Sequence, residues 1–113
     1  MQIVFESRDA SGNQLRDLSV ERVRFTLRRL SPFVARAKVQ FSDVNGPRGG
    51  VDKRCLVELK TDRAGLLVIT SLASDWRIAL DRALKLSARV LKRSLHRHQK
   101  PARERSARLT LDI

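Results

Sequence analysis

The chain has 113 residues, of which 42% are hydrophobic, and this size and composition fit one compact domain with a core of its own. It contains 24 Lys and Arg against 12 Asp and Glu, so its formal net charge of +12 predicts a polyanionic partner. No run of about 18 apolar residues occurs, and no long apolar run follows a basic start, which argues against a membrane span or a signal peptide. A single cysteine, Cys55, agrees with a reducing compartment, so we expect a cytoplasmic protein.

The first half of the chain predicts a strand, a helix and a second strand. Residues 2–6 (QIVFE) have the composition of a short strand, and over 17–30 apolar residues recur at steps of three and four, as on one helix face. Asp17 or Ser19 is the expected N-cap of that helix, because either side chain can accept a hydrogen bond from a free backbone N–H. Residues 35–42 alternate apolar with polar side chains, of which Arg36 and Lys38 are basic, and this predicts a strand with one buried and one basic face.

The second half predicts a hairpin followed by a long helix. Residues 53–60 alternate again, and after the turn TDRAG the apolar run 65–72 has the composition of another strand. From Asp75 onward the apolar residues have a helical period. The order β-α-β-β-β-α predicts an α+β fold, in which a four-stranded mixed sheet has both helices packed on one face and leaves its other face open.

The domain is expected to occupy residues 1–100. Pro101 ends the helical pattern, and the charged residues behind it favour a basic, flexible tail over 101–113. The alternative is that the last six residues, RLTLDI, pack against the sheet as a further strand.

The glycine-rich stretch SDVNGPRGGVDKR (residues 42–54) lies between two predicted strands. A phosphate-binding Walker loop needs a glycine, four residues and then Gly-Lys-Ser/Thr at the start of a helix, and this stretch has neither that spacing nor that context. Its glycines suit the positive backbone angles of a loop between antiparallel strands. We therefore expect a hairpin loop, with Arg48 at its tip able to contact RNA.

The sequence predicts neither catalysis nor a bound cofactor. Cys55 falls on the buried side of its strand, where a thiol is inert. His96 and His98 are two positions apart on a helix and point about 200° away from each other, so they cannot hold one metal ion. The 12 acidic residues form no evident carboxylate pair or Ser-His-Asp set. We expect no enzymatic activity, metal, cofactor or small-molecule substrate.

The last helix has its charge on one side. Between residues 75 and 108 there are eleven Lys and Arg against three acidic residues, and no acidic residue occurs between Asp81 and Glu104. Solvated helix faces usually mix both signs, so this face favours nucleic acid as the partner. The candidate RNA-binding residues are Arg82, Lys85, Arg89, Lys92, Arg93 and His96 on this helix, Arg36 and Lys38 on the basic strand face, and Arg48 in the loop.

Few aromatic side chains are available to stack on bases. The chain has four Phe, one Trp and no Tyr, and most of them lie at expected core positions. Because aromatic stacking is how proteins read single-stranded bases, recognition is expected to depend on the RNA backbone and its shape. No segment pairs its basic face with the bulky apolar face that insertion into a bilayer requires, so a membrane partner is not expected.

These features resemble a known family. The order β-α-β-β-β-α, the stretch SDVNGPRGGVDKRCLVEL, the ASD before the last helix and the segment ALKLSARVLKRSL are similar to the ribosome hibernation-promoting factor and ribosome-associated inhibitor family (protein Y, sigma-54 modulation) in its short, single-domain form. The resemblance covers roughly residues 1–98. The family often has Asp-Met-Tyr or Asp-Leu-Tyr where this chain has Asp75-Trp76-Arg77, so contacts that depend on that tyrosine are not expected here.

The resemblance implies a translation inhibitor that binds the ribosomal RNA of the small subunit. Members of the family lie between the head and the body of that subunit, where mRNA and the A-site and P-site tRNAs would lie, and they stop translation in stress or stationary phase. They bind through basic residues of the two helices and of neighbouring loops and strands. In this sequence the best matches are Arg82, Lys85, Arg89, Lys92 and Arg93.

Two alternative functions remain open at this stage. A basic helix beside a three-stranded antiparallel sheet is also how general double-stranded RNA-binding modules are built. The basic helix could instead dock on an acidic protein, as in a modulator of a transcription factor.

Overall fold

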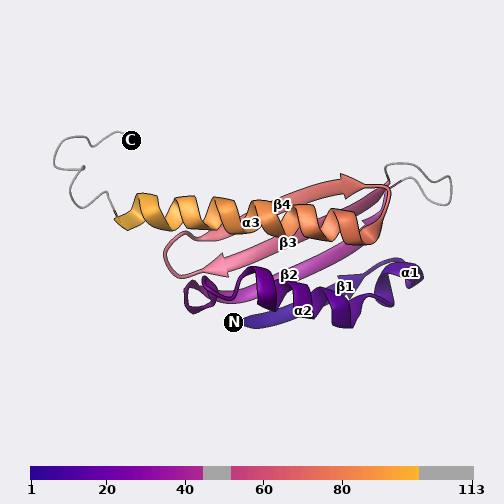
Figure 1. The fold of residues 1–113 in the computed structure, drawn as a ribbon, viewed down its shortest axis with the longest axis horizontal. Helices are drawn as coiled ribbons and strands as arrows, with labels where there is room; N and C mark the ends of the chain where they lie inside the picture. Colours follow the sequence, from indigo (N-terminus) through magenta and orange to yellow (C-terminus); the bar gives the residue numbers. More distant parts are fainter. Residues whose placement is uncertain (45–51, 100–113) are drawn as a thin grey trace.

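A four-stranded mixed sheet, in the spatial order β1-β2-β3-β4, positions every other element of the fold (Figure 1). The computed structural model describes residues 1–44 and 52–99, with side chains up to residue 96. β1 and β2 pair in parallel, whereas β2 with β3 and β3 with β4 pair antiparallel. The strands are β1 (Gln2–Ser7), β2 (Val34–Asp43), β3 (Lys53–Thr61) and β4 (Leu66–Ala73).

The helices pack on one face of this sheet, as the sequence predicts. α2 (Arg16–Thr26) follows β1 and crosses back toward β2, and α3 (Trp76–Gln99) packs over β3 and β4. Two short elements were not predicted, namely α1 (Ala10–Asn13) and the 3-10 turn η1 (Ser31–Phe33). The α+β fold and its order are confirmed. The predicted loop over 45–51, with Arg48, and the predicted tail over 101–113 lie outside the described residues.

The start of the first helix region differs from the prediction. Neither Asp17 nor Ser19 is a cap, because α2 begins after Leu15 without a side-chain capping bond. Capping occurs earlier, at α1, where the carboxylate of Asp9 accepts a hydrogen bond of 2.8 Å from the backbone N–H of Ser11. Hydrogen bonds from the Ser11 side chain and backbone lower the pKa of Asp9. The side-chain cap by Asp9 therefore lies at α1, upstream of the apolar pattern over 17–30 that predicted the helix.

α2 also ends before the predicted residue 30. Leu30 donates its backbone N–H to the carbonyl of Leu27, three residues back, and Phe33 donates to Leu30 in the same way. These hydrogen bonds to the carbonyl three residues back replace the α-helical hydrogen bonds to the carbonyl four residues back. Pro32, which has no N–H to donate, lies within η1. The chain thereby turns sharply into β2.

A β-bulge shifts the start of β2. The register with β3 is irregular between Val34 and Arg36, so Val34 is buried and Ala35 is exposed. The alternation over 35–42 places Ala35 on the buried face, and this assignment is wrong because the extra residue of the bulge interrupts the period of two. From Ala37 to Phe41 the predicted alternation is confirmed, whereas Ser42, expected on the other face, is also buried.

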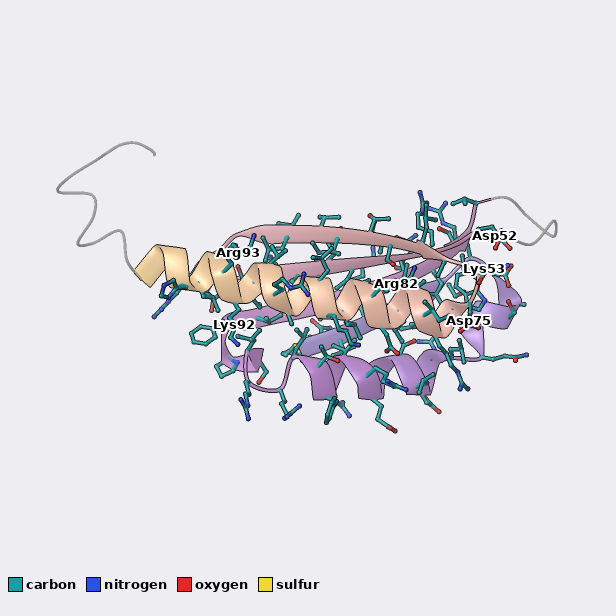
Figure 2. All side chains as sticks on the ribbon, turned by 45° about the horizontal axis from the view of Figure 1, so that its top comes forward. Asp52, Lys53, Asp75, Arg82, Lys92 and Arg93 are labelled. Carbon is teal, nitrogen blue, oxygen red and sulfur yellow. The ribbon has the colours of Figure 1, made fainter. Side chains whose placement is uncertain are left out.

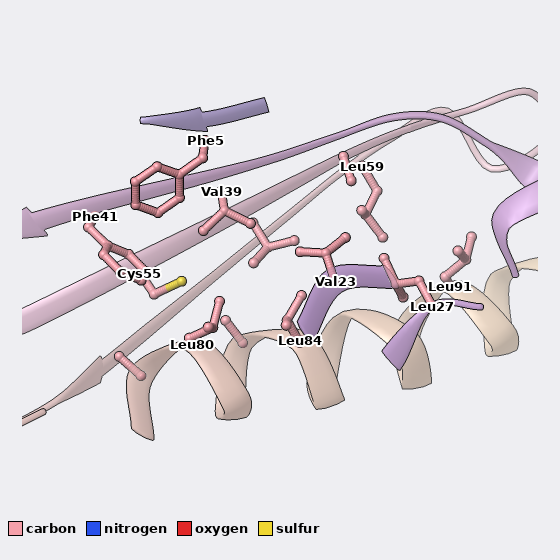
Figure 3. Packing of buried hydrophobic residues seen from close by; sticks show 14 of the residues in the cluster. Phe5, Val23, Leu27, Val39, Phe41, Cys55, Leu59, Leu80, Leu84 and Leu91 are labelled. Atoms are coloured by element: carbon pink, nitrogen blue, oxygen red, sulfur yellow. The ribbon is translucent and has the colours of Figure 1, made fainter. Parts of the chain in front are cut away.

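The core joins the two helices to the covered face of the sheet (Figure 3). At one end, the ring of Phe41 meets the edge of Phe5 at a centroid distance of 5.2 Å and stacks on Trp76 at 4.8 Å. The indole N–H of Trp76 donates to Ser11 Oγ at 3.1 Å, which ties α3 to α1. Toward the other end, Leu27, which follows α2 as its C-cap, and Leu91 of α3 are both fully buried.

Replacing Trp76 tests this aromatic contact. We expect Trp76→Ala to lower the free energy of unfolding by about 3–5 kcal/mol, because it removes a large buried ring and leaves a cavity beneath α3. Trp76→Phe is the control, since it keeps an aromatic ring against Phe41 and removes the indole hydrogen bond to Ser11. Urea denaturation followed by far-ultraviolet circular dichroism measures both variants. Equal losses in the two variants would contradict a dominant role for the ring stack.

Candidate nucleic-acid interface

α3 carries exposed basic side chains along its outer side, among them Arg82, Lys92 and Arg93 (Figure 2). The carboxylate of Asp75 caps the helix by accepting from the backbone N–H groups of Arg77 and Ile78, at 3.1 and 3.4 Å. The apolar period predicted for this helix corresponds to a mostly buried face, with Val90 only half-buried. The buried apolar residues of this face are Ala79, Leu80, Ala83, Leu84, Leu91 and Leu95. The predicted basic residues Arg82, Lys85, Arg89, Lys92, Arg93 and His96 are all exposed.

The acidic residue nearest to this surface already has a partner. Asp81 binds Arg22 of α2, with 3.3 Å between Nη1 and Oδ1, so this ion pair joins the two helices. Within the described part of the chain, Lys85, Arg89, Lys92 and Arg93 form no ion pair. Arg82 approaches the sheet instead, with Nη1 at 3.4 Å from the carbonyl oxygen of Leu72. The cations in the second half of α3 therefore keep their donors available to a partner molecule.

A groove of about 490 Å³ runs between the end of α2 and the second half of α3. Four of the side chains that line it are cationic, and none is acidic. Arg28 and Arg29 come from the turn after α2, and Arg89 and Lys92 come from α3. The groove is lined by Thr26, Arg28, Arg29, Leu30, Ala88, Arg89 and Lys92.

Sequence reasoning missed Arg28 and Arg29. The signal was present, because no acidic residue occurs between Glu21 and Asp43, a stretch that contains several arginines. A second hollow, of about 320 Å³ between β1 and α2, shows the contrast, since Asp17 and Glu21 line it together with two arginines. Of these two hollows among the described residues, the groove beside α3 is better suited to an anion.

The structure separates the predicted site residues into two surfaces. Arg36 and Lys38 alternate with buried residues that face the helices, so they lie on the open face of the sheet. There Lys38 pairs with Glu6 of β1 at 3.5 Å, and Arg36 is exposed beside Lys60 of β3. These two cations therefore cannot act together with the groove on a single phosphate.

Phe25 is an exception among the aromatics expected in the core. Its side chain is 65% exposed on α2, and the guanidinium of Arg28 lies over its ring at 4.4 Å from the centroid. Arg28 also donates to the carbonyl oxygen of Phe25 at 2.8 Å, which fixes the guanidinium in this position. An exposed aromatic ring therefore stands next to the cationic groove.

The residues at the start of α3 have different roles. Trp76 belongs to the core, whereas Arg77 is exposed and adds a cation at the start of α3. Nearby, Lys53 lies 2.8 Å from the carboxylate of Asp43 and 3.4 Å from that of Asp52 (Figure 2). The hydrogen bond with Asp43 raises the pKa of Lys53. This lysine is neutralised by its neighbours and does not extend the basic surface.

The described residues offer no metal site of three or more His, Cys, Asp or Glu side chains. Cys55 is fully buried on β3, and burial raises the pKa of its thiol to about 12. His96 is exposed on α3, while the side chain of His98 lies outside the described part of the chain. Among the described helices, none has the length and apolar composition needed to cross a membrane.

The state of Cys55 can be measured directly. Because thiolate is the reactive form and the pKa of this thiol is far above 8, we expect the folded protein at pH 8 not to react with an aromatic disulfide reagent. Addition of denaturant should release one equivalent of reactive thiol, which the absorbance of the reagent reports. Rapid reaction without denaturant would mean that this part of the sheet opens readily.

The fold is shared with solved structures of two other proteins. The Protein Y N-terminal domain of Thermus thermophilus matches with a TM-score of 0.60 and 24% sequence identity, over 82% of this chain and 98% of that one. A ribosomal subunit interface protein from Coxiella burnetii matches with a TM-score of 0.62 and 14% identity, over 82% of this chain and 96% of that one. No protein-family model and no curated protein sequence matches. At these identities the likeness establishes the fold.

Proposed function

We propose that this protein is a ribosome-associated factor without catalytic activity, which binds ribosomal RNA of the small subunit and holds ribosomes in an inactive state in the cytoplasm. The observation that carries the proposal is the groove with four cationic side chains and no acidic one. Two structural neighbours, a Protein Y domain and a ribosomal subunit interface protein, support the ribosome as the partner. The sequence resemblance favours the same partner.

The groove suits the sugar-phosphate backbone of folded RNA. Arginine guanidinium groups can donate two parallel hydrogen bonds to phosphate oxygens, and cations on both walls let one phosphate be approached from two sides. Arg28 and Arg29 would act from the α2 side, and Arg89 and Lys92 from the α3 side. A protein held in this way near the decoding region would occupy the path of mRNA and tRNA, so steric exclusion alone would stop translation.

Phe25 adds a second kind of contact to this model. Bases of folded RNA that are not stacked on both sides can stack on an exposed aromatic ring or on a guanidinium plane. Phe25 and Arg28 provide both groups at the edge of the groove. Recognition by backbone and shape would then be supplemented by one stacking contact.

Competition separates this proposal from a general double-stranded RNA-binding module. Excess duplex RNA should displace a general binder from ribosomes but have little effect on a protein that recognises one ribosomal site.

A protein partner, such as an acidic transcription factor, is tested by nuclease treatment, because binding through RNA is lost when the RNA is digested. Co-sedimentation with 30S, 50S and 70S particles identifies the particle that is bound.

Salt dependence tests the electrostatic mechanism. If about six phosphates are neutralised, affinity for ribosomal particles should fall roughly 100-fold between about 0.1 and 0.3 M monovalent salt, using a slope near 0.7 per phosphate. The fraction that co-sediments with particles at each salt concentration gives the slope. An affinity independent of salt would rule out docking through the basic groove.

Charge reversal in the groove tests the site itself. Arg89→Glu combined with Lys92→Glu places two carboxylates where phosphate oxygens are expected, so ribosome binding should weaken by at least about tenfold. Stability should change little, because both side chains are exposed on α3 and single exposed substitutions usually cost within about 0.5 kcal/mol. Co-sedimentation measures binding, and thermal denaturation measures stability.

The matched control is Arg36→Glu combined with Lys60→Glu. These exposed residues are register partners on the open face of the sheet, and the pair changes the net charge by the same amount. The control should lose only the share of affinity that depends on total charge. If both double variants lost binding to the same extent, the groove would not be the docking surface.

A further inference from the structure

β4 is an edge strand whose outer backbone groups are unpaired. Its sequence, LLVITSLA, contains no charged residue and no proline, whereas exposed edges are normally blocked by charges, prolines or bulges. Thr61 of β3 donates its backbone N–H to the carbonyl oxygen of Gly65 at 3.0 Å, so Gly65 and every second residue after it point their backbone groups toward β3. Leu66, Val68 and Thr70 therefore point theirs outward, and no strand in the described part of the chain pairs with them.

A row of apolar side chains runs along this edge. Three side chains of β4 are about half exposed on the face of the sheet away from the helices, namely Leu66, Val68 and Leu72. Their register partners on β3 are Lys60, Glu58 and Arg54, so a cation stands beside each end of the row. An exposed apolar row with a charged rim is typical of a surface that binds a partner.

The flank of α3 above β4 adds an apolar side chain between two cations. Arg82 Nη1 lies 3.4 Å from the carbonyl oxygen of Leu72, which places this flank of the helix at the edge. Leu86 lies one turn further along the same side and is 40% exposed. The exposed Arg93 follows Arg82 by about three turns, or roughly 16 Å along the helix. No acidic residue occurs on α3 after Asp81, and Asp81 is paired with Arg22 of α2.

We propose that β4 and this flank of α3 bind an acidic peptide segment of a partner protein, which adds to the sheet as a further strand. Strand addition satisfies the backbone groups of an exposed edge, and alternate side chains of the added segment give specificity. On the helix side the segment meets Leu86 between two cations, so it needs an apolar residue between two carboxylates. Positions four apart in a strand share a face and lie about 13 Å apart, which long side chains extend to the separation of Arg82 and Arg93.

The segment that fits both faces is Glu-Val-Leu-Val-Glu. Its glutamates and leucine share the helix side, while its valines share the open side and cover the apolar row of β4. The pattern reads the same in both directions, so it suits parallel and antiparallel pairing alike.

The charge of this edge favours an acidic partner over a second copy of the chain. Pairing of β4 with β4 of another copy would bring the two α3 flanks together, and Arg82 and Arg93 of each copy would repel those of the other. An acidic segment meets opposite charge at the same positions. The site also lies on the flank of α3 away from the groove that Lys92 lines, so a bound peptide leaves that groove free. The inference therefore goes beyond the proposed RNA binding and adds a protein partner.

Three synthetic peptides test the proposal on the full chain. The probe is Thr-Glu-Val-Leu-Val-Glu-Thr with blocked ends and a fluorophore, the second peptide has Lys in place of both Glu, and the third keeps Glu but has its three central residues N-methylated. Fluorescence anisotropy measures their affinities. We expect the probe to bind at least about tenfold more tightly than either control, because the second has the wrong charge and the third cannot pair as a strand. Equal binding of the probe and the N-methylated peptide would mean general attraction to a cationic chain and would overturn strand addition.

Two substitutions in the protein locate the contact. Arg93→Glu and the matched control Lys92→Glu make the same charge change at adjacent positions, but Lys92 lies on the side of α3 toward α2 (Figure 2). We expect Arg93→Glu to weaken binding of the probe by about tenfold and Lys92→Glu to change it far less. Equal losses in the two variants would contradict a site on the β4 flank.

Hydrogen–deuterium exchange shows which strand is covered. A saturating amount of the probe should slow the exchange of amides in Leu66–Ala73, because added strand pairing protects the edge, and should leave β1 at the opposite edge unchanged. Binding of the probe without protection of β4 would overturn the proposal. Protection of β4 that is present without the probe and falls on dilution would assign the edge to a second copy, and would overturn it as well.

Discussion

The aromatic contact around Phe41 is the constraint on which the rest of the structure depends. Phe41 lies on the central strand β2, meets Phe5 of β1 edge-on and stacks on Trp76 at the start of α3. α3 is therefore anchored where it begins, and its remaining turns extend over β3 and β4 toward the end of α2. The groove that holds Arg28 and Arg89 on opposite walls exists because both helices are held against the same sheet face.

The distribution of the few acidic residues explains why the groove between α2 and α3 has cationic side chains and no acidic one in its lining. Asp9 and Asp75 cap helices, and Asp81 pairs with Arg22 between α2 and α3. Asp43 lies against Lys53 at the far end of the sheet. Each of these carboxylates stabilises the fold at a place outside the groove, so the cations that line it repel one another. Binding of a polyanion would relieve that repulsion. In the proposed function, the affinity for the polyanion is therefore electrostatic and depends on the salt concentration.

The elements that the sequence predicted well are those with a long and regular apolar period. β3 and α3 have such periods, and Cys55 is buried as its alternation predicts. The bulge at Val34 was not predictable from the sequence. A bulge is an extra residue in one strand relative to its partner, and the alternation within one strand does not contain the pairing with the other. The groove was missed for a related reason: Arg28 and Arg89 are about 60 residues apart, and their proximity depends on helix packing. Arg36 was grouped with them on its charge, although the alternation of residues 35–42 already places it on the sheet face opposite the helices.

The two faces of the domain differ in a way that gives the proposed complex an orientation. The second half of α3 presents cations whose donors are available. On the open sheet face, in contrast, Lys38 is paired with Glu6 of β1 and has Glu58 of β3 as its register partner. A face of mixed sign attracts a polyanion less than a face of one sign does. If the groove binds ribosomal RNA, the open sheet face must therefore point away from that RNA. The open sheet face would then be the surface that incoming mRNA or tRNA meets, and steric exclusion alone would keep those ligands out.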